Sequence, residues 1–172
     1  MTEFVVRPAT PADLAEVGRI TFEAYDAGPG AGTPAYVEVL RDSQSRFDHA
    51  ALYVAESDAA VVATMTLAGP GTVHSEIARD HELEVRYLAV DPAWWGKGIA
   101  RLLIAQARVD ASAAHSYLVL DVITHNAKAH DMYRALGFVR APHRDFVPVP
   151  NVYLEAYEDA TSPYWHGERP AD

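Results

Sequence analysis

The stretch L-A-V-D-P-A-W-W-G-K-G-I-A-R-L-L, residues 88–103, joins an apolar strand pattern to a helix pattern through a short turn. The strand pattern ends at Asp91-Pro92, because proline lacks the amide that a strand ladder needs. Gly96 and Gly98 carry no Cβ, so backbone amides there can approach an anion closely. A helix that begins near Ile99 would add unpaired N–H groups and a partial positive charge. The stretch therefore predicts a loop that holds phosphate groups.

Three kinds of phosphate loop compete for this turn, and two of them need residues that it lacks. A Walker loop needs Gly-Lys followed by Ser or Thr, but Gly98 follows Lys97. A dinucleotide fingerprint needs a third glycine at the position of Arg101. The third kind is a coenzyme A pyrophosphate loop, with the pattern Arg/Gln-x-x-Gly-x-Gly/Ala between a strand and a long helix.

Strand and helix patterns follow one another along the rest of the chain. The first helix starts where Thr10 precedes Pro11, and Gly137 ends the last one in the usual way. Strand patterns cover residues 3–8, 51–56, 61–68, 82–90, 116–123 and 138–141, with further strands in 146–157, and helix patterns cover residues 10–25, 35–47, 97–113 and 126–136.

These elements come in the order strand, two helices, three strands, helix, strand, helix and two strands. Because strands and helices do not alternate strictly, a plain doubly wound sheet is disfavoured. We expect an α/β fold of the mixed α+β kind, with a sheet that is antiparallel in its N-terminal part and βαβ-like in its C-terminal part. A length of 172 residues favours one domain, over residues 1–160, followed by a polar tail over residues 161–172.

The composition of the chain excludes some classes of protein and disfavours some kinds of binding partner. The chain has no cysteine, which excludes disulfides and thiolate chemistry. It shows neither a signal-peptide pattern nor an apolar run long enough for a membrane helix, so we expect a cytoplasmic protein without a membrane partner. A net charge of −10 argues against a nucleic-acid partner. It fits a cationic small molecule, although such a charge also serves solubility.

The stretch at 88–103 resembles the central acetyl-CoA motif of the GNAT family of N-acetyltransferases. Gly98 and Ala100 match the small positions of that motif. Trp95 stands where the family usually has Arg or Gln, which removes a polar side chain but leaves the backbone amides in place. We interpret Trp94 and Trp95 as packing the loop against the sheet, with stacking on adenine as the alternative.

A second stretch, N-A-K-A-H-D-M-Y-R-A-L-G-F at residues 126–138, resembles the later motif of the same family, Asn-x-x-Ala…Tyr…Gly-Phe. The two motifs have the family's order and spacing. The resemblance implies a mixed central sheet flanked by helices. It also implies direct transfer of an acetyl group from acetyl-CoA, the acyl donor, to a primary amine of a small molecule or peptide.

Site residues follow from this resemblance. Tyr133 matches the family's tyrosine and would protonate the departing thiolate, unless it only packs on its helix face. Asn126 would hydrogen-bond the pantetheine or the phosphates, cap its helix, or do both. The residues expected to contact acetyl-CoA are Leu88, Ala89, Val90, Trp95, Gly96, Lys97, Gly98, Ile99, Ala100, Arg101 and Asn126.

The expected general base is Glu84, on the strand that leads into the acetyl-CoA motif, where several family members place a basic glutamate. A base is needed because an alkyl amine, with a pKa near ~10.4, is almost wholly protonated at neutral pH. Strand alternation puts Glu84 and Arg86 on one face, so an ion pair is the alternative. Further candidates are Glu82, Glu76, His74 and a chain of water molecules.

We expect no metal site. The H-E-L-E-V segment at 81–85 begins like a zinc-protease helix, but Val85 stands where the second histidine is needed. His125 and His130 are five residues apart, off the helical spacing that would let them share a metal.

The sequence does not identify the acceptor. In the family its groove is built from the N-terminal helices and the late strands, here Phe22–Thr33 and residues 143–157, where Tyr25, Tyr36 and Phe146 could line it. Dimers are common in the family, so a homodimer is a further expectation. The alternative function is a non-catalytic acyl-CoA sensor of the same fold, which the tryptophan at position 95 favours and the retained Tyr133 and Asn126 disfavour.

Overall fold

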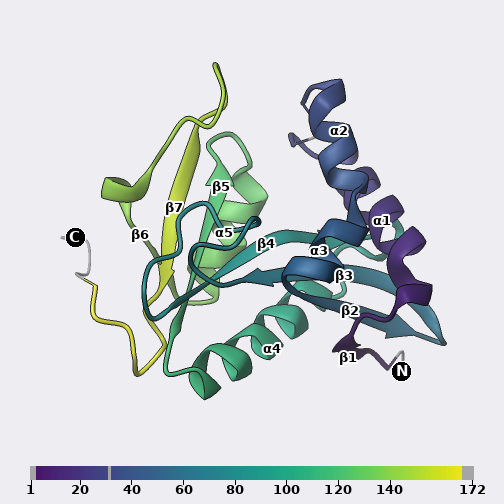
Figure 1. The fold of residues 1–172 in the computed structure, drawn as a ribbon, viewed down its shortest axis with the longest axis horizontal. Helices are drawn as coiled ribbons and strands as arrows, with labels where there is room; N and C mark the ends of the chain where they lie inside the picture. Colours follow the sequence, from purple (N-terminus) through teal and green to yellow (C-terminus); the bar gives the residue numbers. More distant parts are fainter. Residues whose placement is uncertain (1–2, 31, 168–172) are drawn as a thin grey trace.

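The computed structural model describes residues 3–30 and 32–167. Their strands form one seven-stranded sheet in the order β1-β2-β3-β4-β5-β7-β6 (Figure 1). The expected α+β organisation is confirmed. The strands are β1 (Val5–Pro8), β2 (Ala51–Ser57), β3 (Ala60–Ala68), β4 (Glu82–Val90), β5 (Tyr117–Ile123), β6 (Phe138–Arg140) and β7 (Leu154–Asp159).

Neighbouring strands are antiparallel from β1 to β4, parallel between β4 and β5, and antiparallel again from β5 through β7 to β6. The parallel pair needs a crossover connection, and helix α4 supplies it between β4 and β5. The sheet therefore has the antiparallel N-terminal part and the βαβ unit that the order of elements predicted.

Helices cover both faces of this sheet (Figure 1). The main hydrophobic core lies between the sheet and α4, with α5 contributing to the same core. A smaller core forms where α1 packs on β2 from the other side. The helices are α1 (Leu14–Ala27), α2 (Pro34–Arg41), α3 (Ser43–His49), α4 (Ile99–Ala113) and α5 (Ala127–Ala135), with short 3₁₀ turns η1 (Pro11–Asp13), η2 (Pro92–Trp94) and η3 (Pro142–Arg144).

The clearest differences from the sequence patterns lie in two of the helices and in the late strands. The helix expected over 35–47 is two helices, because Asp42 leaves the helical conformation and its side chain accepts a hydrogen bond from the amide of Ser45 at 3.0 Å, which caps α3. The helix expected from residue 97 begins at Ile99, because Gly98 is left-handed with φ +78°. The region 146–157 is regular only in β7, and Phe146 forms a single bridge to Leu154.

Strands β4 and β5 pair only at their beginnings. The parallel ladder runs from Glu82 opposite Tyr117 to Glu84 opposite Val119 and ends there. Three residues later, Tyr87 has a positive φ of 50°, and the pairing of β4 with β3 shifts register at this point. Such a bulge bends a strand and increases its local twist. The two central strands therefore separate over their second halves.

The described part of the tail contacts the domain. The indole Nε1 of Trp165 donates to Glu158 Oε2 at 2.8 Å, and Tyr164 meets the ring of His115 edge-on at 5.3 Å. The expected tail also includes residues 168–172, which lie outside the described residues. Within the described ranges, none of the helices combines the length and the apolar character needed to cross a bilayer.

Candidate active site

The turn after β4 has an open outer face. Its first residue, Asp91, accepts a hydrogen bond from the amide of Ala93 at 2.9 Å and so starts η2. Gly96 and Gly98 both have φ +78°, and a Cβ added at either would meet no atom within 4 Å. The left-handed conformation explains the two glycines, and the empty space lets a ligand approach the backbone.

Helix α4 begins at this turn without a side-chain cap. By contrast, the side chains of Thr33, Asp42 and Asn126 cap α2, α3 and α5. The first amides of α4 are thus left for water or a ligand, and the helix dipole adds partial positive charge there. Lys97 and Arg101 are exposed beside it, and the first turn of α4 has no acidic residue. The arrangement suits an anion.

The two tryptophans of the turn have different environments. Trp94 packs against the main core and meets Phe4 edge-on at 5.9 Å, so it takes the packing role expected of both. Trp95 is 44% exposed and is tied to the sheet by one hydrogen bond, from its Nε1 to the carbonyl of Val90 at 2.7 Å. The Nζ of Lys128 lies 5.7 Å from its ring centroid. The Trp95 ring is therefore free to meet a ligand.

Leu88, Ala89 and Val90 lie beyond the bulge of β4. Ala89 and Val90 pair with Thr64 and Ala63 of β3 on one side. On the other side the ladder with β5 has already ended, so this edge has no strand partner among the described residues. The separated strands offer an extended backbone edge that leads to the turn with Gly96 and Gly98.

Tyr133 of α5 lies in the main core and is 7% exposed. Its ring meets Phe138 edge-on at 5.5 Å and lies 6.5 Å from the ring of Tyr157. Burial, together with the nearby carboxylate of Asp121, raises the pKa of Tyr133 well above its usual value near 10. The phenol therefore stays protonated at neutral pH, as a proton donor must, although its packing also gives it a structural role.

Asn126 caps α5, because its side-chain oxygen accepts from the amide of Ala129 at 3.2 Å. The capping alternative is thus confirmed. The cap uses the amide oxygen, and the NH₂ group of Asn126 carries two further donors.

Glu84 is fully buried and accepts five hydrogen bonds. Oε2 accepts from the Ser75 hydroxyl and from the amides of Glu76, Ile77 and Ala78 at 2.8–3.1 Å. Oε1 accepts from Arg86 Nη1 at 3.1 Å, which confirms the ion pair predicted from strand alternation. Glu84 therefore holds the β3–β4 connection in place, and these contacts disfavour it as the general base.

The other candidates for the general base also take part in ion pairs or hydrogen bonds. Glu82 is buried in an ion pair with Arg144 at 2.6 Å. Glu76 pairs with Arg86 at 2.9 Å. His74 lies 3.1 Å from the hydroxyl of Ser45, and burial lowers its pKa.

The structure draws attention to one carboxylate that the sequence reading missed, Asp121 of β5. Its neighbours Leu120 and Val122 point into the main core, so Asp121 lies on the opposite face of the sheet, toward α1. Oδ2 of Asp121 is buried without a hydrogen-bond partner among the described residues. Burial raises its pKa to about 7, against the opposing effect of Arg86. A lone acid within the apolar run Y-L-V-L-D-V-I was the available signal.

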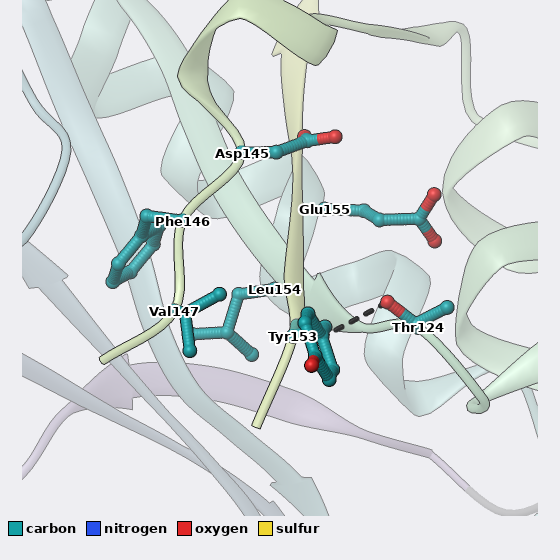
Figure 2. A pocket seen from close by; sticks show the side chains of 7 residues that line it. All are labelled: Thr124, Asp145, Phe146, Val147, Tyr153, Leu154 and Glu155. Atoms are coloured by element: carbon teal, nitrogen blue, oxygen red, sulfur yellow. Dashed lines mark hydrogen bonds between the residues drawn. The ribbon is translucent and has the colours of Figure 1, made fainter. Parts of the chain in front are cut away.

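The late strands form a small cavity of about 390 Å³ (Figure 2). Phe146 lines it, whereas Tyr25 and Tyr36 meet each other edge-on at 6.4 Å between α1 and α2, so the three aromatic residues expected in the acceptor groove do not share this cavity. Figure 2 shows Asp145 and Glu155 extending together on the side away from Phe146, and Arg140 binds both carboxylates at 2.7 and 3.1 Å. The lining residues are Thr124, Asp145, Phe146, Val147, Tyr153, Leu154 and Glu155.

Histidine and carboxylate groups give no metal candidate: across residues 3–30 and 32–167, no three of them gather as metal ligands would. His130, for example, bonds the hydroxyl of Tyr157 at 2.6 Å.

Comparisons with known proteins agree with this geometry. PaiA N-acetyltransferase from Thermoplasma acidophilum, solved with coenzyme A, superposes with a TM-score of 0.70 at 13% identity over 91% of this chain and 99% of that one. YncA from Salmonella typhimurium, solved with acetyl-CoA, gives 0.69 at 20% identity over 98% and 99%. The ribosomal-protein-S18-alanine N-acetyltransferase from Escherichia coli gives 0.66 at 17% identity over 99% and 100%.

At these identities the solved structures show the fold alone. No match is found among curated protein sequences. The acetyltransferase (GNAT) family model matches residues 18–138, a span that runs from α1 through the turn before α4 to Phe138. The chain belongs to the GNAT family of acetyltransferases.

Proposed function

We propose that this protein transfers an acetyl group from acetyl-CoA to a primary amine. The observation that carries the proposal is the uncapped N-terminus of α4, which begins at two left-handed glycines beside the separated ends of β4 and β5. Coenzyme A and acetyl-CoA in the solved PaiA and YncA structures support the choice of ligand.

The pyrophosphate of the donor would lie against the turn. The amides of residues 96–101 would donate to its oxygens, and Lys97 and Arg101 would balance its charge. The pantetheine arm would then run along Leu88, Ala89 and Val90 and bond to their free edge as an added strand does. The NH₂ group of Asn126 would donate to the same arm while its oxygen caps α5. The loop would hold the anion mainly through backbone amides, so Trp95 would not prevent binding.

Tyr133 would act as the general acid. The amine nitrogen attacks the thioester carbonyl carbon, and collapse of the tetrahedral intermediate breaks the C–S bond. The departing thiolate then takes the phenolic proton of Tyr133, which its raised pKa keeps in place until that step. Glu84 was the expected base, but its five donors leave that role to another group.

The acceptor is proposed to be cationic, because the protein carries a net charge of −10. A homodimer and a cytoplasmic location stay predictions from the sequence.

Calorimetric titration with acetyl-CoA, with ATP and NAD as controls, tests the donor site. We expect micromolar binding of acetyl-CoA alone. Gly98→Ala should weaken it at least tenfold, because a Cβ would occupy the space where the anion approaches and would strain a residue at φ +78°. Gly71→Ala is the matched control, since Gly71 has φ +73° and equally open surroundings in the β3–β4 connection. Equal affinity of the two variants would contradict this donor site.

Turnover is tested separately, by release of the free thiol of coenzyme A in the presence of a panel of primary amines. Release of the free thiol that depends on the added amine would support acetyltransferase activity. Tight binding of acetyl-CoA without release for any amine would favour the non-catalytic sensor.

A further inference from the structure

We infer that Asp121 is the group that binds the ammonium of the acceptor and removes its proton, an inference that rests on the proposed acetyl transfer. It assigns a catalytic residue for that reaction. Three observations lead to it: the place of Asp121 in the sheet, its missing partner, and the groups around it.

The place of Asp121 follows from the register of β4 and β5. The ladder pairs Glu82 with Tyr117 and Glu84 with Val119, so two residues further it would bring Arg86 opposite Asp121. The strands separate before that point. Arg86 instead donates to Glu84 and Glu76. The separation of the strands therefore places Asp121 beside the gap where the thioester of the donor is proposed to lie.

The missing partner makes Asp121 unlike the other carboxylates of this region. Glu84 accepts five hydrogen bonds and Glu82 is paired with Arg144. Oδ2 of Asp121 is buried and has no partner in the described part of the chain. Burying a carboxylate in this state is costly, and the cost is recovered when a cation binds. An alkyl ammonium supplies both the charge and three N–H donors.

The charged groups that act on Asp121 lie on β4 and in the β3–β4 connection, and Ala156 is opposite it on β7. Arg86 of β4 favours its ionised form, whereas Glu76 and Glu84 oppose it. On the helices, Tyr25 of α1, Tyr36 of α2 and Tyr133 of α5 all have a raised pKa, to which the charge of Asp121 contributes. These phenols stay neutral, so the only cation among the named groups is Arg86, which the two glutamates already balance. A substrate cation would meet a net negative site.

With a pKa of about 7, Asp121 is ionised above neutrality while the amine, near ~10.4, is still protonated. The ion pair therefore forms first, and one proton passes from the ammonium to Asp121. The neutral amine attacks the thioester carbon, and the sulfur leaves with the proton of Tyr133. The new C–N unit gives its second proton to the Tyr133 phenolate, and Asp121 releases its proton to solvent. The sum is amide, free thiol and one proton.

The kinetic test compares Asp121→Asn with Asp131→Asn, whose carboxylate on α5 is 82% exposed. The acceptor is the most active amine of the panel. For the unchanged protein and for Asp131→Asn, kcat/KM should fall below about pH 7 as Asp121 becomes protonated. Asp121→Asn should lower kcat/KM by about 10²–10⁴. Its residual rate should follow the free amine, about tenfold per pH unit, while its affinity for acetyl-CoA is unchanged. The inference would be overturned if Asp121→Asn kept its activity and its kcat/KM still fell below about pH 7.

A second measurement does not depend on acetyl transfer. In the unfolded chain Asp121 ionises at about pH 4, whereas in the folded protein its pKa is about 7. The free energy of unfolding therefore decreases as pH rises from about 4 to about 7. Asp121→Asn removes this loss of stability. Its Tm should therefore exceed that of the unchanged protein by more at pH 8 than at pH 5, whereas Asp131→Asn should show no such pH dependence. If the gain is the same at both values, Asp121 is not the buried ionisable group, whatever the enzyme assay shows. Absence of acetyl-CoA binding would instead count against the proposed function.

Discussion

Arg86 donates to Glu84 on its own strand at 3.1 Å, while Oδ2 of Asp121, opposite Arg86 in the continued register of the next strand, has no partner among the described residues. The guanidinium of Arg86 is thus paired with Glu84, the carboxylate that holds the β3–β4 connection. Because the bulge at Tyr87 separates the strands, the second carboxylate is left for a ligand. The same distortion that exposes the backbone edge for the donor frees the charge for the acceptor.

The role of Glu84 in holding residues 75–78 gives a prediction about stability. Glu84→Gln puts an NH₂ group where Oε2 now faces four donors or where Oε1 faces Arg86. It should reduce the free energy of unfolding by about 2–4 kcal/mol, because buried donors lose their acceptor. Urea denaturation measures this as a lower midpoint at constant slope.

Glu76→Gln is the control, since Glu76 also pairs with Arg86 but its side chain is 37% exposed, and it should cost about 1 kcal/mol or less. Equal losses for the two variants would contradict the anchoring role. In the folded fraction of Glu84→Gln, kcat/KM should still fall at acidic pH, with its midpoint moved below about pH 7, because the charge of Glu84 no longer raises the pKa of Asp121. Loss of that fall would return Glu84 to the role of base.

Much of the donor site could be predicted from the sequence because its signals are local. Gly96 and Gly98 next to a strand end and a helix start are sufficient to predict an anion loop, and Asn126 before an A-K-A-H run predicts a cap. These features depend on residues within one or two turns of chain, and the structure has each of them in the expected place.

The base could not be predicted in this way because it depends on contacts between distant segments. Glu84 looks available until the amides of residues 76–78 fold back onto it, six to eight residues away. Asp121 looks like an ordinary strand acid until the ladder between β4 and β5 stops at Val119. The split at Asp42 was missed for a simpler reason, since one residue leaves the helix and caps the next within an otherwise helical pattern.

The departure of Trp95 from the family's usual Arg or Gln predicts a change in donor affinity. The Trp95 ring is 44% exposed and held by a single hydrogen bond to Val90, so the position tolerates another long side chain. Trp95→Arg should tighten binding of acetyl-CoA by about 3–10-fold, because a guanidinium can bond a phosphate with two N–H groups. The gain should shrink at high salt, which screens exposed charges.

Trp95→Phe separates the two effects of this change, since it removes the bond to Val90 without adding a charge. Calorimetry at two salt concentrations measures all three proteins. Weaker binding by Trp95→Arg than by Trp95→Phe would mean that the phosphates do not lie near position 95, and that the indole itself contacts the donor.

The last prediction separates the two roles of Tyr133, the proton donor and the packing residue. Tyr133→Phe keeps the ring that meets Phe138 at 5.5 Å and Tyr157 at 6.5 Å, so the free energy of unfolding should change by about 1 kcal/mol or less. It removes the proton that the thiolate needs, so kcat should fall by about 10²–10³ while the affinity for acetyl-CoA is retained. Tyr164→Phe, in the tail where its ring meets His115 at 5.3 Å, should leave kcat within about twofold. Release of the free thiol under saturating donor measures kcat for each variant. If Tyr133→Phe turns over as fast as the unchanged protein, the phenol only packs, and the thiolate takes its proton from solvent.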